Sequence, residues 1–174
     1  MKKILFILAL SITCYASAQK KTAVKKDKNG HLIGYVKKSA FLDKSYSRWF
    51  TKNYDSYKTE EAVISKIRKK INKCKIAGFM GVWCGDSRRE VPKLYKILEE
   101  ANFNMDNLEM IALNRSKRTP DNLQKGYNII RIPTFVFYKD GKEIGRFVEY
   151  SRETLERDIL KILTTKTYKH SYQK

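Results

Sequence analysis

The sequence has few cysteines, and this excludes one class of fold. Its 174 residues include three cysteines. One of them, Cys14, lies in an apolar stretch that we expect to be removed, which would leave Cys74 and Cys84. Two cysteines are too few for a disulfide-stapled scaffold, so the fold must be stabilised by a packed apolar core.

A long hydrophobic run is also absent. The apolar segment Ile4–Ile12 is shorter than the roughly 18 to 20 residues needed to span a bilayer. Two lysines precede it and the small residues Ala16-Ser17-Ala18 follow it, which is the pattern of a secretory signal peptide cleaved after Ala18. We therefore predict an exported protein, periplasmic or secreted, with residues 1–18 as signal peptide and no transmembrane segment in the mature chain. A lipid on Cys14 is the less favoured alternative, because the residue before it is not small.

Acidic residues are scarce relative to basic ones. The chain has 37 Lys and Arg against 18 Asp and Glu, a formal net charge of +19, and loss of the signal peptide would lower it to +17. Such a charge attracts polyanions. Because export argues against nucleic acid as the partner, the candidates are an anionic envelope surface and acidic client proteins. The simpler interpretation is a lysine-rich surface that is only solvated.

The remaining chain suits one domain with an N-terminal extension. Residues 19–58 begin with a basic leader that reaches Asn29 and has too little apolar content to fold. The aromatic-rich stretch after it is interpreted as a packing face rather than a ligand-stacking surface (Phe41, Tyr46, Trp49, Phe50, Tyr54, Tyr57). Residues 59–163 form the main domain, and residues 164–174 form a polar tail that we expect to fray.

The periodicity of apolar residues predicts the elements of the domain. Strands are predicted at residues 31–36, 76–83, 108–113 and 132–138, with a hairpin turn at 140–141 leading to a strand at 143–148. Helices are predicted to begin at Thr59, after Cys84 and at Ser151, and a short helical stretch is predicted from Pro120 to Gly126. This alternation indicates an α/β fold, a three-layer sandwich around a central mixed β-sheet.

The sequence Trp83-Cys84-Gly85-Asp86-Ser87 lies between a predicted buried strand and a predicted helix. The first N–H groups of a helix have no partner within the helix and carry partial positive charge, which favours a thiolate over a thiol. The thiolate is the nucleophilic form of cysteine. Cys84 is therefore a candidate nucleophile, although a lone cysteine at a strand end is more often buried and inert.

The sequence from Ile76 to Leu163 resembles the thioredoxin family in four features that occur in the same order. These are Trp83-Cys84 at the entry to the redox motif, Pro92 in the helix that follows, Arg131-Ile132-Pro133-Thr134 as the cis-proline segment, and the hairpin at residues 139–143. A closer resemblance is to exported bacterial thioredoxin-like proteins with a Trp-Cys-Gly-Asp motif. The resemblance implies a thioredoxin-like sandwich in which cis Pro133 packs beside Cys84. It also implies a substrate groove formed by Trp83, Gly85, Asp86, Arg131, Ile132, Pro133 and Thr134.

Two departures from the family pattern bear on activity. The family's second cysteine releases the mixed disulfide, and Ser87 replaces it here, although a hydroxyl is too poor a nucleophile for that step. The family's buried acid is replaced by Gly78. Cys74 cannot supply the second thiol, because it precedes the strand that Cys84 follows and should lie roughly 20 Å away. A disulfide requires Cα atoms within about 7 Å.

Two functions remain open. The first is monothiol exchange, in which Cys84 attacks a protein or small-molecule disulfide, Ser87 hydrogen-bonds nearby and an external thiol completes the turnover. The resemblance places Arg131 on the groove rim, where it either favours the thiolate or pairs with a surface carboxylate. The second function is a redox-inactive binding domain that uses the groove and the basic surface. We predict no cofactor and no metal site.

Overall fold

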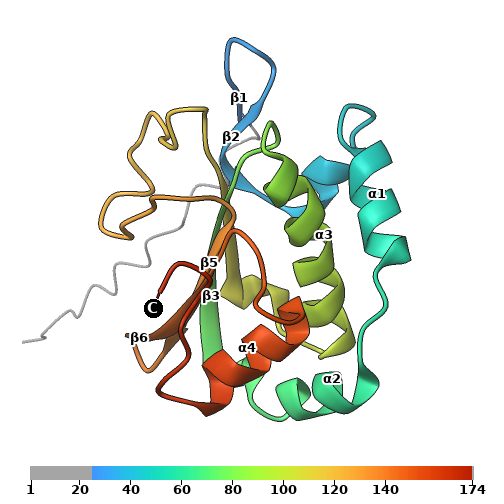
Figure 1. The fold of residues 1–174 in the computed structure, drawn as a ribbon. Helices are drawn as coiled ribbons and strands as arrows, with labels where there is room; N and C mark the ends of the chain where they lie inside the picture. The colour runs from blue at the N-terminus through green and yellow to red at the C-terminus, as the bar shows by residue number, and fades with distance from the viewer. Residues whose placement is uncertain (1–24, 174) are drawn as a thin grey trace, which may run out of the picture.

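A single six-stranded sheet organises the computed structural model, which describes residues 25–173 (Figure 1). The strands follow the order β1-β2-β4-β3-β5-β6. They are β1 (Lys25–Lys26), β2 (Leu32–Val36), β3 (Cys74–Met80), β4 (Leu108–Ala112), β5 (Thr134–Lys139) and β6 (Lys142–Val148). β3 and β4 are parallel, and the other neighbouring strands are antiparallel. The predicted α/β fold with a mixed sheet is therefore confirmed.

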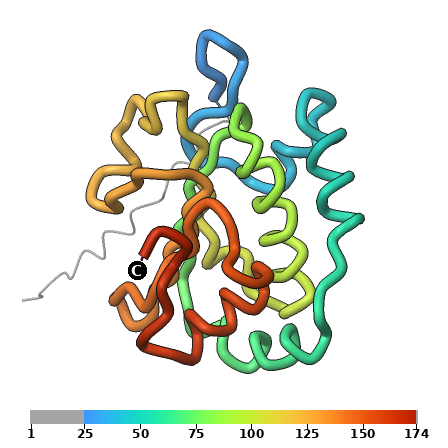
Figure 2. The backbone as a smooth tube through the Cα atoms, in the orientation of Figure 1, coloured from blue at the N-terminus to red at the C-terminus, as the bar shows by residue number. Residues whose placement is uncertain are grey.

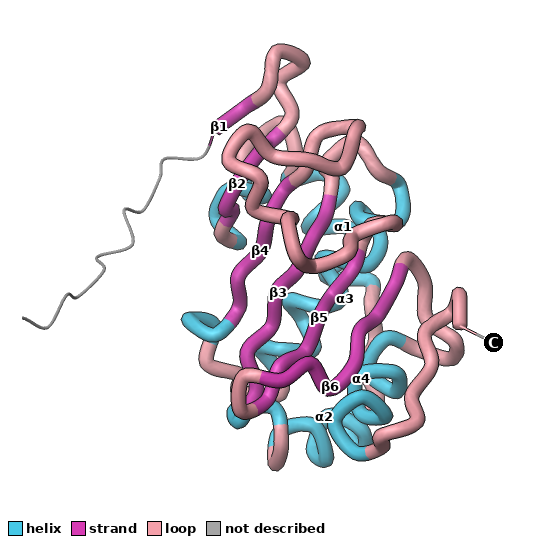
Figure 3. The backbone as a smooth tube through the Cα atoms, turned by 90° about the vertical axis from the view of Figure 1, so that its left-hand side faces the viewer, coloured by secondary structure: helices cyan, strands magenta, loops and turns pink. Residues whose placement is uncertain are grey.

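Four α-helices lie on one face of this sheet, with α1 beside α3 and α2 beside α4 (Figures 1 and 3). They are α1 (Ser47–Ser56), α2 (Glu61–Arg68), α3 (Gly85–Glu100) and α4 (Leu155–Thr164), and short 3-10 helices occur at Lys38–Leu42, Ile71–Lys73 and Met105–Asn107. Two helices begin later than predicted. Glu60 rather than Thr59 is the N-cap of α2, and Thr154 rather than Ser151 caps α4 by accepting a hydrogen bond from the N–H of Arg157.

The opposite face of the sheet is covered by residues 114–132, which form turns (Figure 3). The prediction of a short helix from Pro120 to Gly126 is wrong. Asn122 and Gly126 both have a positive φ, which interrupts a right-handed helix. The hydroxyl of Thr119 also accepts a hydrogen bond from the N–H of Leu123 at 2.9 Å. This side-chain bond occupies a backbone N–H group that a helix would pair with a backbone carbonyl. The third layer of the sandwich is therefore irregular.

The aromatic-rich stretch packs into the core between the helices and the sheet, as predicted. Phe41 and Phe50 are fully buried and their rings stack with centroids 5.3 Å apart. Phe41 also meets Tyr95 of α3 edge to face at 6.0 Å. Residues from the N-terminal extension thus share one apolar core with α3.

The N-terminal part of the described chain is more ordered than its composition predicts. Lys25 and Lys26 pair with β2, and the carboxylate of Asp27 accepts hydrogen bonds from the N–H groups of Asn29 and His31. The basic leader therefore does not extend to Asn29. The predicted signal peptide, the alternative lipid site and residues 19–24 lie outside the described residues. Within residues 25–173, no helix is both long and apolar enough to cross a membrane.

The C-terminal tail was expected to fray, and instead it folds back beside β6 (Figures 2 and 3). The Tyr168 hydroxyl donates a hydrogen bond to Asp158 at 3.0 Å. The guanidinium of Arg152 donates to the carbonyl oxygens of His170 and Gln173 at 3.1 and 2.6 Å. The tail is polar in composition, but these buried and charged partners on α4 and the preceding loop hold it in place.

Candidate functional site

Cys84 is the N-cap residue of α3, and its side chain is partly exposed. A tight turn brings it there from β3, because its N–H donates to the carbonyl of Gly81 at 2.9 Å. Gly81 is required at this turn, since a Cβ atom there would lie 2.7 Å from the ring of Trp83. The indole N–H of Trp83 donates to the carbonyl of Leu113 at 2.9 Å, which ties the turn to the end of β4.

The cis-proline segment lies against Cys84. The Ile132–Pro133 peptide bond is cis, and the thiol of Cys84 donates to the carbonyl of Ile132 with a sulfur–oxygen distance of 3.5 Å. Thr134 begins β5 and pairs with Phe79 of β3, which places the segment next to the strand that leads to Cys84. The Thr134 hydroxyl is buried and donates to the carbonyl of Arg131 at 2.7 Å. Thr134 therefore stabilises the conformation of the cis-proline segment through a buried hydrogen bond and does not face the surface.

Ser87 is completely buried, one turn into α3. Its hydroxyl oxygen accepts a hydrogen bond from the N–H of Gly81 at 3.2 Å. Ser87 is thus a positioning residue, which fixes the turn between β3 and α3. The two residues between Cys84 and Ser87 face outward: Gly85 is exposed, and Asp86 forms an ion pair with Arg89 at 2.8 Å.

Arg131 has the competing role that the sequence left open. One of its terminal nitrogens lies 3.2 Å from a carboxylate oxygen of Glu149. Its guanidinium also lies over the ring of Tyr172, 4.0 Å from the centroid. The Tyr172 hydroxyl donates to the same carboxylate, which raises the pKa of Tyr172 to about 12. Activation of Cys84 by Arg131 stays a prediction.

The comparison with known proteins agrees with this geometry. A family model described as Thioredoxin matches residues 36–161. The chain belongs to the thioredoxin family. It is 30% identical over 94 residues to Thioredoxin H2 of Arabidopsis thaliana, and this alignment covers 54% of this chain and 66% of that protein. It is 31% identical over 85 residues to a thioredoxin-like protein of Acanthamoeba polyphaga mimivirus, and this alignment covers 49% of this chain and 59% of that protein.

One solved structure shows the same fold over a larger part of the chain. A Pseudomonas aeruginosa protein of unknown function superposes with a TM-score of 0.55 at 16% identity, covering 72% of this chain and 89% of that one. This likeness concerns the fold alone. The matched Arabidopsis and mimivirus regions are shorter, since the chain spans about two thirds or less of either relative.

This thioredoxin-family chain has no space for an acid at position 78. Gly78 pairs with Met110 across β3 and β4, and a Cβ atom on Gly78 would lie 2.8 Å from the Met110 sulfur and 2.7 Å from its terminal carbon. The thioether therefore fills the volume that a side chain on Gly78 would need. The sequence alone shows that the acid is absent, because position 78 is a glycine. That Met110 fills its place is known only from the strand register.

Cys74 is the first residue of β3, whereas Cys84 lies beyond its end. Both cysteines are free. Cys74 is only 3% exposed, and burial raises the pKa of its thiol, which disfavours the reactive thiolate. The predicted separation of the two cysteines follows from this position, because the seven residues of β3 span roughly 20 Å. Cys74 is therefore a packing residue.

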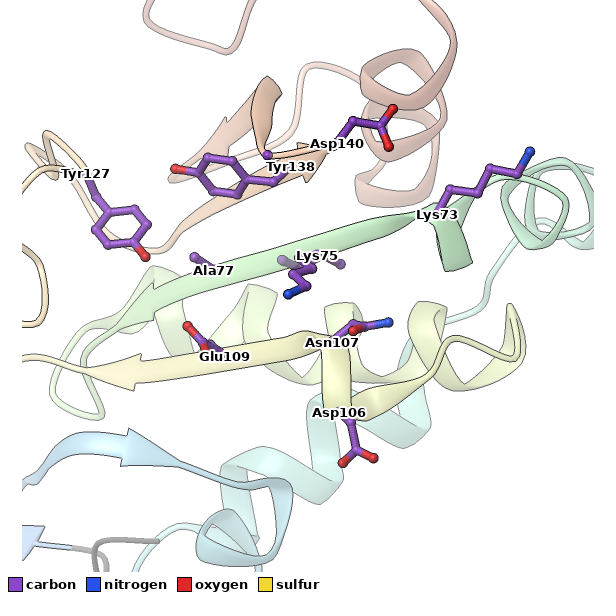
Figure 4. Close-up of a pocket in the computed structure, with 11 residues that line it drawn as sticks. Lys73, Lys75, Ala77, Asp106, Asn107, Glu109, Tyr127, Tyr138 and Asp140 are labelled. Carbon is purple, nitrogen blue, oxygen red and sulfur yellow. The ribbon is translucent and has the colours of Figure 1, made fainter. Parts of the chain in front are cut away.

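A hollow of about 660 Å³ lies on the loop-covered face of the sheet, away from the motif. In Figure 4, Lys75 and Ala77 of β3 lie between Tyr138 of β5 and Glu109 of β4. None of the predicted site residues lines this hollow. The thiol and the cis-proline segment form a separate site at the end of β3.

Proposed function

We propose that this protein performs monothiol thiol–disulfide exchange through Cys84. The observation that supports the proposal most directly is the position of the thiol, which is partly exposed at the N-cap of α3 and lies 3.5 Å from the carbonyl oxygen of Ile132. The free N–H groups and the partial positive charge at a helix N-terminus stabilise a thiolate. Membership of the thioredoxin family is consistent with such exchange.

The reaction has two steps. The Cys84 thiolate attacks one sulfur of a client or small-molecule disulfide, forms a mixed disulfide and expels the other sulfur as a thiolate, which takes a proton from water. Ser87 cannot release the client, and Cys74 is buried at the other end of β3. An external thiolate therefore attacks the client sulfur, forms a new disulfide with it and returns Cys84 as a thiolate.

Incubation with oxidised glutathione followed by peptide mass mapping tests the proposal. We expect one glutathione adduct, on Cys84, that persists until dithiothreitol is added. Cys74→Ala should keep this adduct and Cys84→Ala should lose it. Ser87→Cys should convert the adduct into an internal disulfide with Cys84, because it restores a second thiol one helical turn away. Absence of any adduct on Cys84 at neutral pH would reject the exchange reaction.

A redox-inactive binding domain is the second candidate, and Met110 favours it. The thioether above Gly78 leaves an apolar environment where the family pattern has a buried acid. A binding domain has no requirement for proton transfer at that place. A wild-type protein that forms no adduct but binds clients unchanged in the Cys84→Ser variant would establish this second function.

We further propose that the protein acts outside the cytoplasm, as a periplasmic or secreted protein, because residues 1–18 have the pattern of a signal peptide. The +17 charge of the mature chain would favour an anionic envelope surface or acidic clients. Intact mass of the exported protein tests the location, with Gln19 expected as the first residue. A protein that retains Met1 to Ala18, or that carries lipid on Cys14, would contradict it.

A further inference from the structure

Four cations on the two segments that adjoin the motif have no carboxylate partner among the described residues, and we call them the basic edge: Arg88, Arg115, Lys117 and Arg118. Arg115 and Arg118 are exposed, and Lys117 is half-buried. The turn that carries them is closed by its own hydrogen bonds, since the side chain of Asn114 accepts from the N–H of Arg118 at 3.0 Å and the N–H of Asn114 donates to the Arg118 carbonyl at 3.1 Å. The three cations of this turn are therefore held in one compact loop.

The sheet topology places this turn beside the thiol. β3 and β4 are parallel neighbours, so their carboxyl ends meet at the same edge of the sheet. Arg115 lies over the ring of Trp83, 5.5 Å from its centroid, and Trp83 directly precedes Cys84. Arg88, on the first turn of α3, donates from Nε to the carbonyl of Val82 at 2.6 Å. The basic edge thus approaches the motif from two independent segments.

The acidic groups near the motif are already paired with other cations. Asp86 and Glu90 both bind Arg89, at 2.8 and 2.6 Å. Glu149 binds Arg131. Asp121 lies 3.9 Å from Lys25. The charge of the basic edge is therefore not neutralised within residues 25–173.

We propose that the basic edge selects acidic partners, so that the clients of Cys84 carry glutamate or aspartate residues next to their reactive sulfur. This inference rests on the proposed exchange reaction for the identity of the reacting group. Arginine binds carboxylates in a bidentate geometry, and uncompensated cations accelerate the encounter with an anionic partner. Arg115 lies over the indole ring that precedes the partly exposed thiol, and Arg88 binds the carbonyl of Val82 just before that ring, which suits a peptide that presents one sulfur.

The test compares two peptides, each carrying one cysteine as a mixed disulfide with an aryl thiol and flanked by either four glutamates or four glutamines. The Cys84 thiolate attacks the peptide sulfur and releases the coloured aryl thiolate, so the rate is read directly. We expect the exported protein to react about fivefold or more faster with the glutamate peptide at low salt, and this ratio should fall toward one as salt screens the charges.

A matched pair of variants separates the basic edge from the net charge of the protein. Arg115→Gln/Arg118→Gln should reduce the preference to about twofold or less, since it removes the cation over Trp83 and a second cation of the same turn. Lys69→Gln/Lys70→Gln removes the same charge from exposed positions at the end of α2 and should keep the preference. Equal losses in both variants would mean that net charge alone attracts the peptide, and the proposal would be rejected.

A binding measurement with a variant that cannot react tests the basic edge independently of the exchange reaction. Fluorescence anisotropy of the labelled glutamate and glutamine peptides is measured with the Cys84→Ser variant, which cannot react. Tighter binding of the glutamate peptide, reduced by Arg115→Gln/Arg118→Gln, supports the basic edge even where wild-type Cys84 proves unreactive. If the protein binds phosphatidylglycerol vesicles through these two arginines but neither peptide, its partner is a membrane surface and the inference is wrong.

Discussion

The two faces of the central sheet are built in different ways. On one face, four helices pack against a large apolar cluster that includes Phe41, Ile67 and Leu94. On the other face, a smaller cluster is closed by the irregular segment 114–132, and Trp83 and Cys84 pack at its margin. The helical face supplies most of the buried apolar area, whereas the irregular face brings together the thiol, the cis-proline segment and the basic edge.

This difference follows from the way in which helices and irregular turns present their side chains and backbone groups. Helices present side chains at regular spacing, which suits the burial of a continuous apolar stripe. Turns present backbone groups and charges at irregular angles, which suits a site that must hold a partner. Residues 114–132 contain three non-glycine residues with positive φ (Lys117, Asn122 and Asn128), so this segment is shaped by local turns. The predictions below test whether stability and chemistry divide between the faces in this way.

Truncation of one buried side chain on each face should give the largest effect. Phe41→Ala should lower the free energy of unfolding by about 3–5 kcal/mol, because it removes a fully buried ring that contacts Phe50 and Tyr95. Leu123→Ala should cost only about 1–2 kcal/mol, because Leu123 is partly buried under a segment that can collapse around it. Denaturant unfolding of both variants measures the difference. Equal losses would contradict the division of the two faces.

Restoration of an acid beneath the motif should be the next largest change. Gly78→Asp should destabilise the protein by about 2–4 kcal/mol, because the new carboxyl group meets the Met110 side chain in an apolar environment. Adding Met110→Ala opens that volume. The two changes should therefore cost at least about 1 kcal/mol less together than the sum of their separate costs. Strict additivity in a double-mutant cycle would show that Met110 does not obstruct the acid.

The sequence predicts α2, α3, α4 and the central strands well because their signals are local, whereas α1 is expected only as an aromatic-rich packing stretch. The apolar run at residues 76–83 and the Asp140-Gly141 turn correspond to β3 and to the hairpin between β5 and β6. The placement of Cys84 at the start of α3 follows from the same change of periodicity. These features depend on spacing within a short segment, and that spacing is visible in one sequence.

The irregular face and the tail could not be predicted in the same way, because their structure depends on distant partners. On the helical face, too, a non-local feature escapes the sequence, since the register of β3 against β4 decides that Met110 covers Gly78. The pairing of Arg131 with Glu149 depends on where β6 ends. The position of Arg115 could have been predicted from the sequence, since residues that follow two adjacent parallel strands meet at one edge of the sheet. That rule would have placed Arg115 near Trp83.

The C-terminal tail connects the two faces, since it runs from α4 to the cis-proline segment. Tyr168→Phe should lower the free energy of unfolding by about 1–2 kcal/mol, because it removes a hydrogen-bond donor from the fully buried Asp158. Burial raises the pKa of Tyr168, so its hydroxyl stays protonated and continues to donate. Tyr35→Phe is the matched control, since the exposed Tyr35 hydroxyl has no hydrogen-bond partner among residues 25–173. A loss in the control as large as that in Tyr168→Phe would contradict the role of Asp158.

The smallest predicted effect is a pH dependence of the tail at His170. Burial, and then the charges of Arg146 and Arg152, lower the pKa of His170 below its ordinary value, while Glu143 acts in the opposite direction. The neutral ring accepts a hydrogen bond at Nδ1 from the N–H of Tyr172 at 3.2 Å, and protonation removes that acceptor. Because the pKa is lower in the docked tail than in a free one, docking is stable above about pH 6.5 and weakens as the pH falls below that value.

NMR signals of the Tyr172 ring report this release most directly, because the ring lies over Arg131 in the docked tail. Between about pH 7.5 and about pH 5 we expect these signals to shift toward those of a free peptide, with little change in global unfolding. His170→Gln should abolish the shift, because the glutamine side chain takes up no proton in this pH range. Tyr172 signals that move equally in this variant would assign the pH dependence to another group and leave the tail as a permanent link between the two faces.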